Sequence, residues 1–128
     1  MFGELEHVAI AARDTESLAK WYMEVLGYEL GYRDPKTGTY FIKRGGRSML
    51  EITPANTAPR ANRAMKDPGI SHLAIWVDDF DHSYQSLKEK GVKFVSDVDE
   101  EKGIKKVVFF EDPESNLLHL MHRPKPVA

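Results

Sequence analysis

Two matching segments of the chain each place a histidine in front of alternating apolar residues. Residues 7–14 read His-Val-Ala-Ile-Ala-Ala-Arg-Asp, and residues 72–79 read His-Leu-Ala-Ile-Trp-Val-Asp-Asp. The shared His, Ala, Ile and final Asp indicate an internal repeat. The alternation predicts two β-strands, each with an apolar face and a second face of mostly small residues that carries the histidine. Small residues leave space in front of a sheet, where an imidazole can act as a metal ligand or as a base.

The same alternation extends to a later strand of each repeat. Within residues 48–53, Glu51 lies between two apolar neighbours, and within residues 117–122, His119 does the same. The repeat therefore predicts four polar groups on inner faces: His7, Glu51, His72 and His119. Three imidazoles and one carboxylate suit one divalent ion per chain, such as Zn, Ni, Co, Fe or Mn. The chain has no cysteine, which excludes a thiolate site and a disulfide framework.

The elements that position these groups repeat in the same order. A helical stripe over residues 15–26 follows the first segment, with Asp14 or Thr15 as its N-cap and Gly27 at its end. The other expected elements are strands 28–33, 39–44 and 48–53, then strand 70–78, helix 80–90, strand 92–96, an acidic turn 97–103, and strands 104–111 and 117–122.

We expect an α+β fold built from two tandem βαβββ modules, residues 1–53 and 70–124. Residues 54–69, which contain three prolines, form the connector between them. Neither module can bury both faces of its sheet alone. Together they are expected to form one domain, with a curved mixed sheet around a central groove and the helices on the outer face.

Composition limits the classes of function. The 128 residues have a formal net charge of -2, which argues against a nucleic-acid surface. No apolar run approaches membrane-spanning length, and the N-terminal residues lack the pattern of a signal peptide. We expect a cytoplasmic homodimer that binds a small-molecule substrate and neither nucleic acid nor a membrane.

Further side chains are candidates for a substrate pocket. Tyr40, Trp76 and Phe109 supply aromatic surface for an apolar pocket. Arg44 and Arg47 are candidates for binding an anionic part of the substrate.

The doubled order of elements resembles the vicinal oxygen chelate superfamily, which includes glyoxalase I, bleomycin-resistance proteins and extradiol dioxygenases. The resemblance covers nearly the whole chain. It is carried by residues 7–10, 21–28, 50–52, 72–75 and 110–120, in that order and at that spacing.

The resemblance implies a metal site and a reaction. His7, Glu51 and His72 fall on glyoxalase-type ligand positions, and His119 stands where the metal enzymes usually have Glu. The implied enzyme is a metal-dependent lyase or isomerase that acts on vicinal oxygens through a stabilised enediolate, with Glu51 or His119 moving the proton. Positions that glyoxalase I uses for glutathione fall at Ala11 and near Ala55, so lactoylglutathione lyase activity is less expected than a metal site.

Two other functions remain open from the sequence. Two histidines and one carboxylate also suit an Fe(II) dioxygenase of extradiol type. The third possibility is a non-catalytic binder, like the drug-sequestering resistance proteins of this fold.

Overall fold

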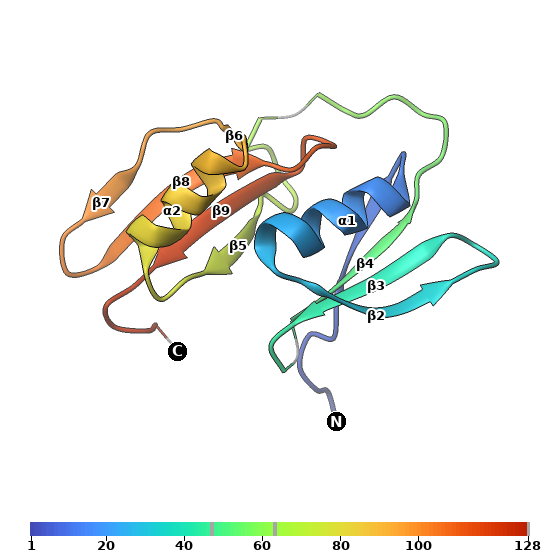
Figure 1. Ribbon diagram of the computed structural model, residues 1–128, viewed down its shortest axis with the longest axis horizontal. Helices are drawn as coiled ribbons and strands as arrows, with labels where there is room; N and C mark the ends of the chain where they lie inside the picture. The colour runs from blue at the N-terminus through green and yellow to red at the C-terminus, as the bar shows by residue number, and fades with distance from the viewer. Residues whose placement is uncertain (47, 63, 128) are drawn as a thin grey trace. The chain divides into compact units, whose positions relative to one another are not determined.

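A computed structural model describes residues 1–46, 48–62 and 64–127 of the chain. Its elements follow the expected order of two repeats (Figure 1). They are β1 (Val8–Ala12), α1 (Thr15–Leu26), β2 (Glu29–Asp34), β3 (Thr39–Arg44), β4 (Ser48–Pro54), β5 (Leu73–Trp76), α2 (Phe80–Glu89), β6 (Lys93–Phe94), β7 (Asp99–Glu101), β8 (Lys105–Glu111) and β9 (Leu117–His122).

The chain divides into two compact units, Met1–Arg60 and Ala61–Ala128, and each unit has its own mixed sheet. The first sheet has the strand order β1-β4-β3-β2, in which only the β1–β4 pair is parallel. The second has the order β5-β9-β8-β6, with β7 paired to β8, and only the β5–β9 pair is parallel. The α+β class predicted from the sequence is confirmed.

In the first unit, α1 covers one face of the sheet (Figure 1). The helix begins at its N-cap Asp14, whose carboxylate accepts a hydrogen bond from the Ser17 backbone nitrogen at 3.0 Å. It ends at Gly27, whose φ of 76° is a left-handed conformation that glycine adopts without steric cost. Both signals agree with the sequence prediction. Tyr22 on the helix and Ile52 on β4 are fully buried between the two layers.

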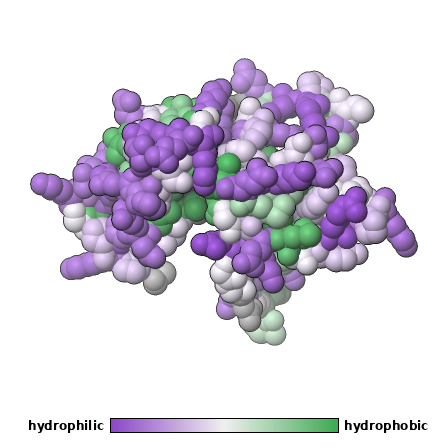
Figure 2. Space-filling view, viewed as in Figure 1, coloured by the Kyte–Doolittle hydropathy of each residue, from purple (hydrophilic) through white to green (hydrophobic). Residues whose placement is uncertain are grey.

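In the second unit, Asp79 caps α2 as Asp14 caps α1, since its carboxylate accepts from the His82 backbone nitrogen at 3.1 Å. The final Asp of each repeated octapeptide therefore starts a helix. Leu87 of α2 packs toward a core that includes Phe110 and Leu118, both fully buried. Hydrophilic side chains cover the outer side of α2 (Figure 2), as expected for an amphipathic helix.

The second unit contains one strand that the sequence did not predict. The acidic segment 97–103 was expected to be a turn, but its central residues form β7. There Glu100 stands opposite Lys106 and Glu101 opposite Lys105 on β8. Oppositely charged cross-strand neighbours favour this pairing although the segment lacks apolar alternation. Among the described residues, no helix is long and apolar enough to cross a membrane.

Candidate metal-binding and catalytic site

The first unit brings His7 and Glu51 into contact. His7 directly precedes β1, and the parallel pairing of β1 with β4 sets Ala9 beside Glu51. The Nε2 atom of His7 lies 3.2 Å from Oε2 of Glu51, and the two side chains are about one-third and one-quarter exposed (33% and 25%). Two ligand atoms held at about 2.1 Å from one divalent ion lie roughly 3.0–3.4 Å apart at octahedral or tetrahedral angles. The spacing of this pair therefore suits two ligands of one ion.

A second carboxylate contacts the other nitrogen of the same ring. Glu6 Oε1 lies 2.9 Å from Nδ1 of His7. When Nδ1 donates its hydrogen to Glu6, Nε2 keeps its lone pair and points toward Glu51. A hydrogen bond of this kind, donated to a carboxylate, orients a metal-ligating histidine and selects its tautomer. In the second unit Ser71 has the same relation to His72, with Oγ 2.8 Å from Nδ1.

The second unit brings His72 and His119 together around Phe109. The two imidazole centroids are 4.8 Å apart. The Phe109 ring stacks on His119 at 4.2 Å with planes inclined by 16°, and its edge meets His72 at 5.1 Å. This packing restricts the orientation of both imidazoles, which a preformed ligand pair requires.

The Nε2 atom of His119 is buried and has no hydrogen-bond partner among the described residues. Burial, as the largest cause, lowers the pKa of His119 to about 4 together with the charges of His72, Lys105 and Arg123. The ring is therefore neutral at pH 7, which is the protonation state that ligates a metal. A buried nitrogen without a partner is costly, and a bound cation would satisfy it.

The registers of the two sheets show that the two pairs occupy equivalent positions. In the first sheet, Glu51 on β4 lies between Ala9 on β1 and Phe41 on β3. In the second sheet, His119 lies between Ala74 on β5 and Phe109 on β8 in the same way. The repeat found in the sequence is thus a repeat of the local environment of Glu51 and His119.

Phe41 is a residue of this site that the sequence analysis missed. Its ring meets His7 edge-on at 5.8 Å, and it pairs across the sheet with Glu51. Phe41 is the counterpart of Phe109. Counting the alternation through strand 39–44 would have found it, because a residue directly opposite Glu51 in an antiparallel pair shares its face.

Tyr40 and Arg44, predicted to line the substrate pocket, lie on the other face of the first sheet. Tyr40 pairs with Ile52, is buried on the helix side, and its hydroxyl accepts a hydrogen bond from Arg33 at 3.1 Å. Arg44 has the same parity as Tyr40, and its guanidinium lies beside Gly27 at the end of α1. The side chains of β3 alternate, and its odd-numbered residues lie on the face of Glu51. Neither Tyr40 nor Arg44 therefore lies on the face where it was predicted.

The other residues predicted to line the substrate pocket are Phe109, Trp76 and Arg47. Phe109 lies on the face of His119, as described above. Trp76 pairs with Met121, two positions from His119 on β9, and its indole nitrogen donates to Asp78 at 3.0 Å. Trp76 is 45% exposed and is therefore free to contact a ligand. Arg47 lies outside the described residues.

Each unit therefore offers two side chains that can ligate a metal, His7 with Glu51 and His72 with His119. Within residues 1–46, 48–62 and 64–127, no group of three or more His, Asp or Glu side chains is close enough to hold a metal ion. The chemistry of the two pairs nevertheless fits a divalent cation. The fit rests on the buried free Nε2 of His119 and on the spacing of His7 and Glu51.

Several curated proteins are similar to this chain. Methylmalonyl-CoA epimerase of Bos taurus is 31% identical over a compared length of 102 residues, and the match covers 74% of this chain and 58% of that protein. The chain thus matches little more than half the length of this relative. Ethylmalonyl-CoA/methylmalonyl-CoA epimerase of Cereibacter sphaeroides is 31% identical over 125 residues, covering 91% of this chain and 93% of that protein.

Solved structures and a family model agree with these similarities. A glyoxalase family protein from Enterococcus faecalis has a TM-score of 0.75 and 30% identity, covering 94% of this chain and 98% of that one. The model of the Glyoxalase/Bleomycin resistance protein/Dioxygenase superfamily matches residues 4–120. The chain therefore belongs to the Glyoxalase/Bleomycin resistance protein/Dioxygenase superfamily.

Proposed function

We propose that this protein is a metal-dependent isomerase that moves a proton on a carbon next to a carbonyl group. The observation that carries this proposal is the pair of equivalent donor sites, His7 with Glu51 and His72 with His119. Similarity to two methylmalonyl-CoA epimerases at 31% identity favours an isomerase among the reactions of the superfamily.

In this proposal His7, Glu51, His72 and His119 serve as ligands of a divalent metal. Zn, Ni, Co, Fe and Mn all accept three imidazoles and one carboxylate as ligands. Such an ion would supply a Lewis acid that stabilises negative charge on a substrate oxygen.

Glu51 is the proposed base because it is the only carboxylate of the set. It would take the proton from the substrate carbon as the C–H bond breaks, and the electron pair would move to the carbonyl oxygen. Addition of a proton to the opposite face of that carbon, by an acid other than Glu51, completes the isomerisation with no change in the substrate's composition. His7, 3.2 Å from Glu51, positions the carboxylate.

His119 would contribute in its neutral form. Its pKa of about 4 keeps the ring unprotonated at pH 7, so it offers a lone pair and no acidic proton. Phe109 covers one face of the ring and limits access of water to it. His119 is therefore proposed first as a ligand, and second as an acceptor for the proton in place of Glu51.

The test is exchange of the substrate proton with solvent. Methylmalonyl-CoA in deuterated buffer should gain one deuterium at its α-carbon with wild-type protein and an added divalent metal, measured by mass spectrometry. Glu51→Gln should lower the exchange rate by at least about 100-fold, since general-base catalysis contributes that much. His82→Ala, a histidine on α2, is the matched control and should keep the wild-type rate.

Other outcomes would contradict the proposal. Exchange that is equal in wild type and Glu51→Gln would exclude Glu51 as the base. Oxygen uptake with a catechol would indicate the dioxygenase instead. Tight binding of a small molecule by metal-free protein, without turnover of any substrate, would indicate a binding protein. The cytoplasmic location and the homodimer remain predictions, and the second is checked by light scattering.

A further inference from the structure

Two cations stand opposite each other at one end of the second sheet. The antiparallel register of β8 and β9 pairs Lys106 with His122 and Val107 with Met121. The pairing ends at Lys106 and His122, and continuing it by one residue would set Arg123, directly after β9, opposite Lys105. Both side chains have the same parity as Phe109 and His119, so they lie on the face of the sheet that carries His119.

This arrangement is unfavourable without an anion. Like charges directly opposite each other on neighbouring strands repel. Lys105 and Arg123 are both partly buried. In the part of the chain that the structure describes, neither forms an ion pair. Glu101 is opposite Lys105 on β7, but it is exposed and no ion pair joins the two.

Two neighbouring lysines, Lys106 and Lys93, form ion pairs with carboxylates. Lys106 turns to the other face of β8, where its Nζ lies 2.7 Å from Asp81 of α2. Lys93 pairs with Glu111 at 3.1 Å. Lys105 and Arg123 thus differ from Lys93 and Lys106 in sharing the face of His119 and in forming no ion pair with a carboxylate.

We propose that Lys105 and Arg123 form an anion-binding subsite for phosphate groups of an elongated acyl-thioester substrate. Arg123 is four residues from His119 along the chain, a separation of about 13 Å in extended backbone. A small substrate cannot reach both points, whereas a thioester of coenzyme A can place its acyl group at one and phosphates at the other. Arg binds phosphate with two parallel hydrogen bonds and Lys adds a point charge.

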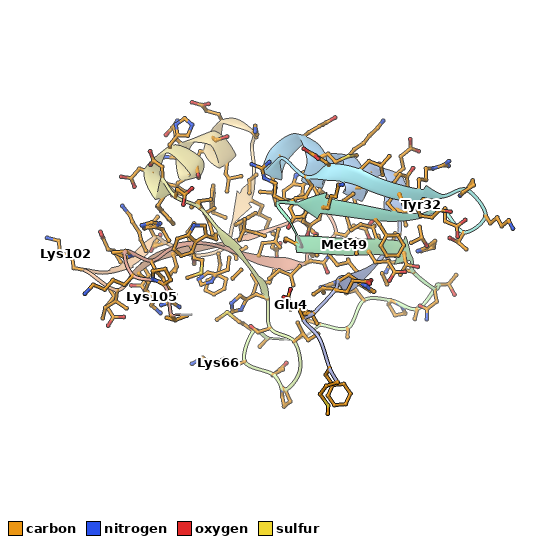
Figure 3. The ribbon with its side chains drawn as sticks, turned by 90° about the horizontal axis from the view of Figure 1, so that it is seen from below. Glu4, Tyr32, Met49, Lys66, Lys102 and Lys105 are labelled. Atoms are coloured by element: carbon orange, nitrogen blue, oxygen red, sulfur yellow. The ribbon has the colours of Figure 1, made fainter. Side chains whose placement is uncertain are left out.

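This inference rests on the proposed function only for the kind of substrate. Figure 3 shows the setting of Lys105 near the β7–β8 turn, with Lys102 at the turn itself. Lys102 is exposed and provides a control for the loss of one positive charge at this end of the sheet.

The test uses pyrophosphate as the probe, in calorimetric titrations that need no turnover. Lys105→Ala combined with Arg123→Ala should weaken pyrophosphate binding by at least about tenfold, because two charge-assisted interactions are lost. Lys102→Ala should bind as wild type does. Coenzyme A should compete with pyrophosphate, and pantetheine, which lacks phosphate, should not. Circular dichroism should show that the double variant keeps its fold, since it removes a repulsive pair.

Three results would overturn the inference. The first is pyrophosphate binding that is unchanged in the double variant. The second is an equal loss in Lys102→Ala, which would indicate a diffuse charge effect. The third is competition by pantetheine as strong as by coenzyme A. If proton exchange with methylmalonyl-CoA fails while pyrophosphate binding depends on the pair, the proposed function falls and the subsite stands.

Discussion

The Phe109 ring lies flat against the His119 imidazole, with centroids 4.2 Å apart and planes inclined by 16°. Phe109→Leu keeps most of the volume but removes this stack. We expect a change in unfolding free energy below about 1.5 kcal/mol, as for other volume-conserving replacements. We also expect metal affinity to fall by about tenfold, because residues that orient ligands have effects of this size. Calorimetric metal titration and urea unfolding separate the two effects.

Tyr32→Leu is the control for Phe109→Leu, since Tyr32 is an aromatic residue that is 57% exposed. Phe41→Leu should behave as Phe109→Leu does, because Phe41 bears the same relation to His7 and Glu51. Unchanged affinity in both Phe variants would show that the aromatic rings have no role in positioning the ligands.

Glu6 Oε1 lies 2.9 Å from Nδ1 of His7. We therefore expect Glu6 to orient a metal ligand without being a ligand itself. Glu6→Ala should lower metal affinity by about tenfold, since the hydrogen bond that orients the ring is lost. Glu6→Gln should remain within about threefold of wild type, because an amide oxygen accepts the same hydrogen bond more weakly. Glu16→Ala, an exposed carboxylate on α1, controls for the change in net charge. Equal affinities of all three variants would exclude this role.

Asp112 holds the turn that leads from β8 into β9 and so places His119 against Phe109. It is 4% exposed and accepts hydrogen bonds from the backbone nitrogens of Glu114 and Asn116, at 2.9 and 3.0 Å. Asp112→Ala leaves these donors without their partner and should lower the unfolding free energy by about 2–4 kcal/mol. Asp97→Ala, at an exposed site, should change it by less than about 0.5 kcal/mol. Equal free energies of unfolding in urea for the wild type and Asp112→Ala would contradict the role of Asp112 in this turn.

The lowered pKa of His119 predicts how stability depends on pH. The folded-state pKa of His119 is about 4, against an ordinary value of 6.5, mainly because of burial. Between these pH values the unfolded chain binds a proton that the folded chain does not, so the unfolding free energy falls as the pH falls from about 6.5 to 4. Partial solvent exposure screens the effect, and we expect a loss of about 1 kcal/mol.

Urea unfolding of chelator-treated protein at pH 7 and pH 4.5 measures this loss. His119→Leu should show a smaller decrease than wild type, since it has no group to protonate at that position. His82→Ala should keep the wild-type difference. A wild-type decrease no larger than that of His119→Leu would show that His119 titrates normally.

Alternation and the internal repeat were sufficient to predict much of this arrangement. Leu50 and Ile52 are buried while Glu51 between them is partly exposed, as the period of two requires. Each repeat also predicted its own helix and its place in the order of strands. These features depend on local pattern, which is why one sequence is enough to find them.

The errors arose where register or tertiary pairing decides the structure. Tyr40 was chosen for the site in place of Phe41, because the strand was identified but its parity was not carried across from Glu51. The strand β7 has no apolar alternation and exists through its pairing with β8. The relation of Glu6 to His7 depends on side-chain conformation, which no periodic pattern reveals.

Metal content tests the central claim most directly. Protein purified without chelator, and protein stripped and then reloaded with Zn, Ni, Co, Fe or Mn, should hold about one ion per chain by elemental analysis. His7→Ala, Glu51→Gln and His119→Ala should each lose most of it, while His82→Ala should retain it. Negligible metal in the wild type, or equal metal in the wild type and the three ligand variants, would contradict the account.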